Sequence, residues 1–156
     1  MTAQEKLPGA RSEDFAAFGE RFKAESELPR PIAERLLRIY GTRAGEVLEI
    51  ACGDTELLKT FSPLTGAIGA ELLYSFRCEM AETLVDCLMR RTMVGLNSAS
   101  GLDAAEAAAR IAQKHLGWDE SRSGIELAAY RNYIERFHPR KMFSAVEDRG
   151  SIKPGV

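Results

Sequence analysis

Five charged side chains in the segment 69–92 are the candidates for chemistry in this chain. These residues are Arg77, Glu79, Asp86, Arg90 and Arg91. A guanidinium group forms paired hydrogen bonds with a carboxylate and equally with a phosphate. Asp86 precedes Arg90 by four residues, which is the spacing of an acid–base pair on one helix face. The pattern therefore indicates a salt-bridge seam within the domain or a surface that docks on a partner.

No group of side chains has the composition of a catalytic or metal site. Glu79, Glu82 and Asp86 are close in sequence, but a carboxylate di-iron site also requires Glu-x-x-His motifs on several helices. His115 and His138 lie far from them, each at the expected C-terminal end of a helix, where the helix dipole favours a cation. Nothing places a histidine and an orienting acid beside any serine, cysteine or lysine. The residues therefore predict no catalytic residue and no metal ligand.

The composition restricts the class of protein and its partners. A chain of 156 residues is long enough for one domain with a core of its own. Its 21 Lys and Arg residues against 23 Asp and Glu residues give a net charge of −2, which does not attract nucleic acid. No apolar run approaches the roughly 18 residues that span a bilayer, and the N-terminus lacks a signal-peptide core. We therefore expect a cytoplasmic protein without a nucleic-acid partner or a transmembrane segment.

The cysteines agree with a reducing compartment. Cys52, Cys78 and Cys87 are odd in number, have apolar neighbours and show no Cys-x-x-Cys spacing. Free cysteines are among the residues most often buried in proteins. We therefore expect all three to pack in the core without a disulfide.

The elements that position the charged segment follow from its apolar residues, which recur at steps of three and four. They are Leu73, Phe76, Met80, Leu84, Cys87 and Leu88. Thr83 and Asp86 have the spacing of a capping box, in which a hydroxyl and a carboxylate accept hydrogen bonds from the free N–H groups of a first turn. We therefore expect the segment to break near Glu82 into two helices that carry a polar seam.

Helical periodicity and cap residues continue along the rest of the chain. Helices are expected after Ser12, from Pro29 to Gly41, from Thr42 to Gly53, after Asp54, from Asp103 to Gly117, and from Asp119 to His138. No segment sustains the alternation of a half-buried strand. The predicted fold is therefore all-α, a single compact orthogonal bundle of about six to seven helices. Its expected parts are a flexible lead-in at 1–11, the helical domain at 12–138 and a weakly ordered tail at 139–156.

Four stretches that occur in order resemble one known family. They are LPGA at Leu7–Ala10 followed by DFAAF, LLRIYGTRAGEVL at Leu36–Leu48, EMAETLVDCLMRRT at Glu79–Thr92, and LGWDESR at Leu116–Arg122 followed by the AAYR of Ala128–Arg131. Together they span about residues 7–137. Over this range the chain is similar to the C-terminal helical domain of FAD-dependent (aerobic) glycerol-3-phosphate dehydrogenase.

The resemblance implies a non-catalytic, cap-like domain that packs on the N-terminal flavin domain of a parent enzyme. The parent reaction would convert sn-glycerol 3-phosphate and quinone to dihydroxyacetone phosphate and quinol. The parent would bind FAD and would lie in the cytoplasm, with peripheral association at the membrane. Arg77, Arg90 and Arg91 are then candidates for docking on the flavin domain or for contact with the substrate phosphate.

This chain lacks the sequence that would bind the flavin itself. A dinucleotide site is expected to open with a strand, a Gly-x-Gly-x-x-Gly turn and a helix. The nearest glycines, Gly66 and Gly69, follow a Ser-Pro-Leu-Thr loop, and a tight start of a helix is their expected role. We therefore expect the chain by itself to bind no FAD and to be inactive.

The residues leave one alternative open. A complete set of helix caps and apolar faces without catalytic groups is also typical of a stand-alone helical protein-interaction module. Such a module would bind another protein through an exposed apolar or Arg-rich face.

Overall fold

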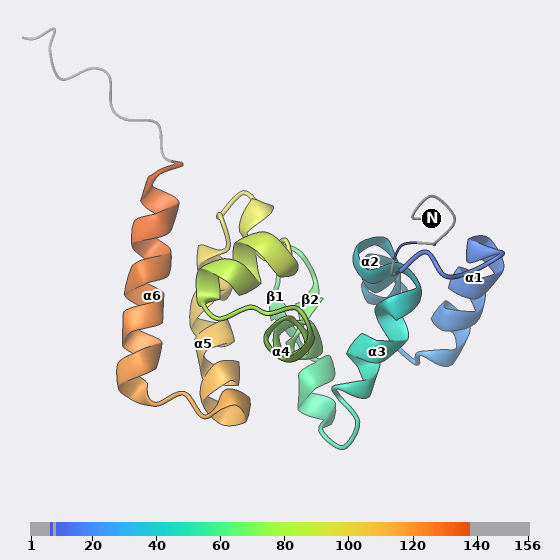
Figure 1. The fold of residues 1–156 in the computed structure, drawn as a ribbon, viewed down its shortest axis with the longest axis horizontal. Coiled ribbons are helices and arrows are strands. Elements are labelled where there is room, and N and C mark those ends of the chain that lie inside the picture. The colour runs from blue at the N-terminus through green and yellow to red at the C-terminus, as the bar shows by residue number, and fades with distance from the viewer. Residues whose placement is uncertain (1–6, 8, 138–156) are drawn as a thin grey trace, which may run out of the picture.

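The computed structural model describes residue 7 and residues 9–137 of the chain (Figure 1). Within that range the α-helices are Phe15–Glu25 (α1), Arg30–Tyr40 (α2), Ala44–Glu49 (α3), Gly69–Cys78 (α4), Leu102–Leu116 (α5) and Glu120–Glu135 (α6). Shorter helical turns are Gly41–Arg43 (η2), Thr55–Leu58 (η3), Asp86–Arg91 (η4) and Val94–Leu96 (η5). Two strands, Thr60–Ser62 (β1) and Ala67–Ile68 (β2), pair antiparallel. The predicted tail at 139–156 lies outside the described residues.

The prediction of a mostly helical compact domain is confirmed, and the β-hairpin is an addition to it. Thr60 pairs with Ile68 and Ser62 with Ala67, so the register shifts by one residue within the hairpin. Strands of three and two residues are too short to show the alternation from which a strand is predicted. The hairpin therefore left no pattern in the sequence.

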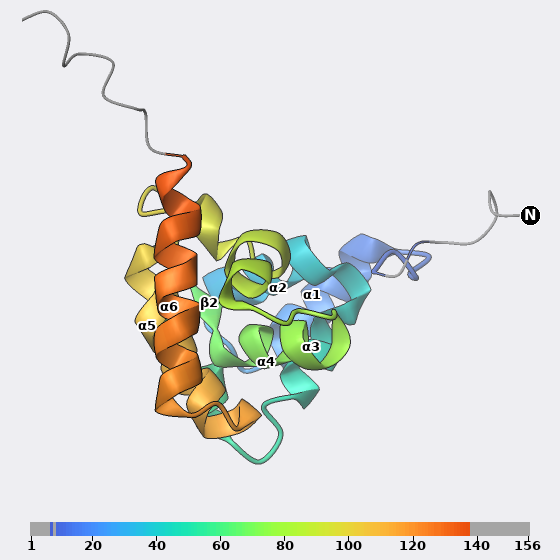
Figure 2. The ribbon, with the colours of Figure 1, turned by 60° about the vertical axis from the view of Figure 1, so that its left-hand side comes forward.

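Helix α4 lies at the centre of the molecule (Figure 1). Helices α1, α2 and α3 lie on one side of it, and α5 and α6 lie on the other (Figures 1 and 2). Residues 69–75 of α4 are all buried, and the core around them includes Leu36, Ile68, Tyr74, Leu84 and Leu88. The first residue of α4 is Gly69, and η3 passes close to it. A Cβ on this residue would lie only 3.3 Å from the Cα of Leu57, which explains why a glycine stands here. The central position of α4 places every side chain of its first two turns in the core.

The predicted break near Glu82 is confirmed. Helix α4 ends at Cys78, and the N–H of Ala81 donates to the carbonyl of Ser75 at 3.0 Å to close its last turn. The prediction that Met80 lies on the apolar face is wrong. Met80 adopts a left-handed φ of 57° and its exposed fraction is 84%. The early end of α4 turns this side chain into solvent.

Two other predicted caps are confirmed, and both are aspartates. The Asp54 carboxylate accepts from the N–H of Glu56 at 3.0 Å and begins η3. The Asp119 carboxylate accepts from the N–H of Arg122 at 2.7 Å and begins α6. At these two positions an aspartate just before the apolar residues of a helix therefore marks its start.

Three predicted caps are wrong because a neighbouring residue begins the helix instead. Helix α1 is capped by Asp14 rather than Ser12, since the Asp14 carboxylate accepts from the N–H of Ala17 at 3.0 Å. Thr42 lies inside η2, so α3 begins only at Ala44. Asp103 is the second residue of α5, and its carboxylate binds other loops.

The cysteine prediction holds for one residue of the three. Cys87 is buried, and burial raises the pKa of its thiol to about 12. Cys52 and Cys78 are exposed, so their expected core packing is wrong. Cys52 follows the end of α3, and Cys78 is the last residue of α4. At the end of a helix, residues that are neighbours in sequence do not share one buried face. All three thiols are free.

Candidate functional site

The structure places the five predicted seam residues at three separate points. The Arg77 guanidinium, at the end of α4, donates to the carbonyl of His115 at 3.4 Å. Asp86 and Arg90 form an ion pair of 2.6 Å along η4. Glu79 and Arg91 lie in a third group together with residues of α3 and η2. The structure thus pairs two of the five residues directly and brings two others near each other.

The third group forms what we call the charged corner, made of Arg43, Glu46, Tyr74, Glu79 and Arg91. The Arg43 guanidinium lies 5.2 Å from the centre of the Tyr74 ring and binds the Glu46 carboxylate at 3.0 Å. The Tyr74 hydroxyl donates to the same carboxylate at 2.6 Å. Glu79 is half-buried, and burial raises the pKa of its carboxyl against the opposing effect of Arg43 and Arg91.

Charges in the charged corner are mostly balanced inside the domain. Hydrogen bonding by Tyr74 lowers the pKa of the Glu46 carboxyl, and Arg43 adds to this effect. The buried Nε atom of Arg91 has no hydrogen-bond partner among the described residues. A group of this kind can pair with polar side chains of another protein surface, but it places no base beside a nucleophile.

Asp86 stabilises the start of the second helical piece of the predicted seam. Its carboxylate accepts from the Thr83 hydroxyl at 2.8 Å and from the Thr83 N–H at 3.2 Å. The Asp86 N–H donates back to the Thr83 hydroxyl at 3.1 Å, which completes the predicted capping box. Burial alone would raise the pKa of the Asp86 carboxyl, but the hydrogen bonds from Thr83 and Glu82 lower it below its usual value. These contacts give Asp86 a structural role within its own helical turn.

A buried ion pair that sequence reasoning missed lies between α2 and α4. The Arg35 guanidinium binds both oxygens of Glu71, at 3.2 and 3.1 Å, and donates to the carbonyl of Thr92 at 2.6 Å. The Glu71 carboxylate also accepts from the N–H of Ile68 at 3.0 Å. Burial raises the pKa of the Glu71 carboxyl, and Arg35 acts in the opposite direction. The available signal was a single ionisable residue inside each of two apolar helix faces.

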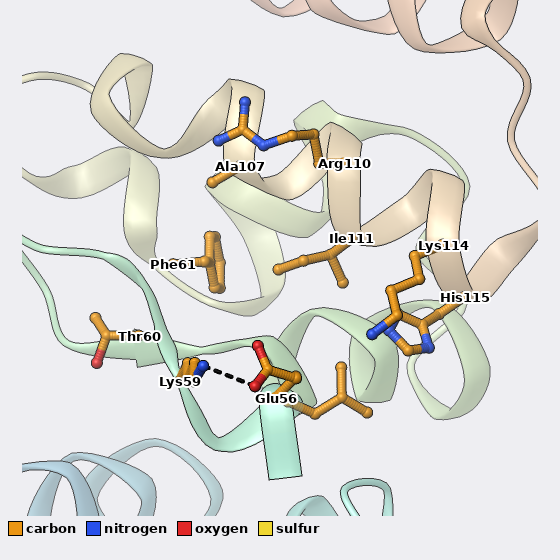
Figure 3. A pocket seen from close by; sticks show the side chains of 10 residues that line it. Glu56, Lys59, Thr60, Phe61, Ala107, Arg110, Ile111, Lys114 and His115 are labelled. Atoms are coloured by element: carbon orange, nitrogen blue, oxygen red, sulfur yellow. Dashed lines mark ion pairs between the residues drawn. The ribbon is translucent and has the colours of Figure 1, made fainter. Parts of the chain in front are cut away.

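An open groove of about 270 Å³ runs between the hairpin and α5 (Figure 3). Figure 3 shows Phe61 of β1 opposite Ile111 of α5 across this groove. It is lined by Glu56, Leu57, Lys59, Thr60, Phe61, Ala107, Arg110, Ile111, Lys114 and His115. Its floor is apolar and its edges carry charged side chains.

Basic side chains outnumber acidic ones along the groove. Lys59 pairs with Glu56 at 2.7 Å, and Lys114 pairs with Asp54 outside the lining at 3.3 Å. Arg110 is exposed, and it forms no ion pair with any residue from 9 to 137. An open, positively charged groove with an apolar floor is suited to a piece of another protein.

The glycine-containing segment around β2 does not fit an FAD site. Gly66 and Gly69 flank β2 of an antiparallel hairpin, whereas a dinucleotide turn joins a parallel strand to a helix. The start of α4 is also occupied by the protein itself. The Gly69 N–H donates to the carbonyl of Lys59 at 3.2 Å, and the Ile68 N–H donates to Glu71. These two N–H groups are therefore not free to bind a pyrophosphate.

The described part of the chain has neither a cluster of metal ligands nor a membrane-spanning helix. No group of three or more His, Cys, Asp or Glu side chains there could hold a metal ion. None of the helices in this part is long and apolar enough to cross a membrane.

Comparison with known proteins gives a family model and several relatives. Residues 1–123 match the family model described as the C-terminal domain of alpha-glycerophosphate oxidase. A glycerol-3-phosphate dehydrogenase of Synechocystis sp. is 29% identical over 136 residues, which are 86% of this chain and 25% of that protein. Glycerol-3-phosphate dehydrogenase 2 of Mycobacterium tuberculosis is 31% identical over 101 residues, 64% of this chain and 17% of that protein. The chain thus spans a quarter or less of these relatives, and no solved structure matches it.

Proposed function

This chain belongs to the family of C-terminal domains of alpha-glycerophosphate oxidase, and we propose that it is the non-catalytic C-terminal helical domain of an FAD-dependent glycerol-3-phosphate dehydrogenase. The observation that carries the proposal is the similarity to the Synechocystis enzyme over 86% of this chain. The parent oxidises sn-glycerol 3-phosphate to dihydroxyacetone phosphate and passes the electrons to quinone. FAD supplies the hydride chemistry and is bound by the flavin domain, which this chain contacts.

The role of this chain is to pack on the flavin domain and stabilise it. The charged corner supports this role, because it brings several polar and charged side chains together, among them the partly exposed Arg43 and Glu46. Interfaces between domains of one protein are more polar than permanent subunit interfaces. We place the parent enzyme in the cytoplasm, with peripheral association at the membrane.

The test uses a flavin domain that lacks its C-terminal part. The flavin domain from the same source is produced alone, together with this chain, and together with an unrelated helical protein as a control. We expect this chain to raise the thermal stability of the flavin domain and its glycerol-3-phosphate-dependent reduction of a quinone analogue. The unrelated protein is expected to change neither. If this chain also changes neither quantity, the proposed function is wrong.

The alternative, a stand-alone helical interaction module, makes a different prediction about size. An antibody raised against this chain detects the native polypeptide in an extract of source cells. A band several hundred residues larger than this chain, in the fraction that oxidises glycerol 3-phosphate, supports the dehydrogenase. A band at the size of this chain favours the interaction module.

A further inference from the structure

Three exposed leucines belong to the segments that are joined at the Asp103 carboxylate. Leu64 lies in the hairpin turn, Leu96 ends η5, and Leu102 begins α5. Their exposed fractions are 57%, 68% and 42%. We call these three leucines the apolar rim. Large apolar side chains that gather on a surface mark a site of interaction more often than scattered ones do.

The Asp103 carboxylate ties together the two loops that carry the apolar rim. One oxygen accepts from the Ser62 hydroxyl, at 3.5 Å, at the base of the hairpin turn. The other accepts from the Asn97 side-chain amide at 3.0 Å, directly after η5. Leu64 and Leu96 are thus each within two residues of a group bound to Asp103, and Leu102 precedes Asp103 in the chain.

The loop between η5 and α5 is held in one conformation. The Asn97 side-chain oxygen accepts from the N–H groups of Ala99 and Gly101, at 2.8 and 3.1 Å. The Tyr130 hydroxyl of α6 donates to the carbonyl of Ser100 at 2.8 Å. Ser100 has a left-handed φ of 50°, a conformation that persists only where the surroundings impose it. A loop that is rigid before binding presents its apolar side chains at a lower entropic cost.

The basic groove of Figure 3 is lined in part by the hairpin and by α5, which also carry residues of the apolar rim. It starts at Phe61, next to Ser62 in β1, and at Ala107, one turn beyond Asp103 in α5. Its edge carries the exposed Arg110, which has no ion pair within residues 9–137. The hairpin and α5 therefore carry both exposed apolar side chains and a positively charged groove.

We propose that the apolar rim and the basic groove dock on the flavin domain, against an apolar patch flanked by carboxylates. This inference rests on the proposed function. The relatives place three quarters or more of their length outside the part that this chain matches, so in those proteins a large partner surface belongs to the same polypeptide as the matched part. The groove is positively charged although the whole chain has a net charge of −2, so its counterpart is acidic. Complementary charge of this kind aligns two surfaces, and the apolar contacts supply most of the affinity.

The test measures the dissociation constant between the complete chain and the flavin domain for matched variants. Leu64→Asp with Leu96→Asp changes the rim, and Arg110→Glu changes the groove. Met80→Asp is the control for the rim, because Met80 is exposed and lies in a different loop. Arg21→Glu, on the exposed side of α1, is the control for the groove. Circular dichroism checks that each variant folds, and Leu64→Ser with Leu96→Ser replaces the aspartate pair if that pair unfolds.

We expect the rim variant to raise the dissociation constant at least tenfold and each control to leave it within about twofold. Arg110→Glu is expected to weaken binding more at low salt than at high salt, because salt screens the charges. If the unchanged chain binds the flavin domain and the rim and groove variants bind equally well, the docking surface is wrong and the proposed function stands. If the unchanged chain does not bind, both are wrong. If sedimentation shows a dimer of the chain alone that the rim variant abolishes, the rim binds a second copy instead and the inference is overturned.

Discussion

At the scale of single residues, the buried pair Arg35–Glu71 connects three parts of the fold. It joins α2 to α4 and, through the carbonyl of Thr92, holds the segment that follows η4. Both side chains are nearly inaccessible, so neither charge can be solvated by water if its partner is lost. Exposed ion pairs such as Arg30–Glu34 lack this property, since water replaces the missing partner.

Removal of one partner of the buried pair is therefore expected to be far more costly than removal of both. We expect Arg35→Met to lower the free energy of unfolding by about 3–5 kcal/mol, because it leaves the Glu71 carboxylate buried and unpaired. The double variant Arg35→Met with Glu71→Leu should lose much less than the two single variants added together. Arg30→Ala serves as the control and should cost less than about 1 kcal/mol. Urea unfolding measures all four proteins, and additive single losses would contradict the coupling.

At the scale of elements, caps decide where the helices of the central segment begin and end. The reciprocal bonds of Thr83 and Asp86 begin the second helical piece, and the bond from Ala81 to Ser75 closes the first. The pKa of the Asp86 carboxyl is lower in the folded protein than its usual value, because the folded structure binds the ionised form. A lowered pKa stabilises the fold above the unfolded pKa and loses that effect as the pH falls through the folded pKa.

The capping box of Thr83 and Asp86 should therefore make a pH-dependent contribution to the free energy of unfolding. We expect Asp86→Ala to lower the free energy of unfolding by about 1 kcal/mol at pH 7, the usual cost of a lost cap. The difference from the unchanged chain should shrink below about pH 4, where the carboxyl of the unfolded chain begins to be protonated. Glu25→Ala, on an exposed face of α1, is the control. Thermal unfolding between pH 3 and 7 tests this, and a constant difference across that range would contradict it.

At the scale of the whole molecule, the domain is built around α4, with its other helices on two sides (Figure 1). Helix α6 lies at the edge and packs mainly along α5 (Figures 1 and 2). Its Ile125 is 66% exposed, whereas residues 69–75 of α4 are all buried. Parts of a protein with few buried contacts open locally at a lower free energy than its centre.

Hydrogen exchange should therefore distinguish α4 from α6 by the exchange rates of their amides. We expect the amides of residues 70–77 in α4 to exchange most slowly and those of residues 124–135 in α6 to exchange faster, through an opening that leaves α4 protected. Exchange measured by mass spectrometry on the complete chain tests this. Equal protection of both helices would show that the domain opens as one unit.

Local patterns predicted much of this fold and little of its polar interior. Thr83 and Asp86 were predicted correctly, since both partners of a capping box lie within one turn of sequence. Asp103 has the same kind of spacing with Glu106, yet its carboxylate binds Ser62 and Asn97 instead. Sequence separation of 41 residues between Ser62 and Asp103 leaves no local signal for such a bond. That the five seam residues dock on a partner remains a prediction.

The sequence by itself determined that this is a helical domain, where most of its helices lie, and to which family it is similar. These properties depend on residues close together in the chain and on their periodicity. Only the tertiary structure decided that Arg35 meets Glu71, that the seam residues separate, and that Asp103 joins Ser62 and Asn97. These meetings depend on how α4, the hairpin and α5 pack, which is set by many weak long-range contacts at once. The candidate docking surface therefore became visible only in the folded molecule.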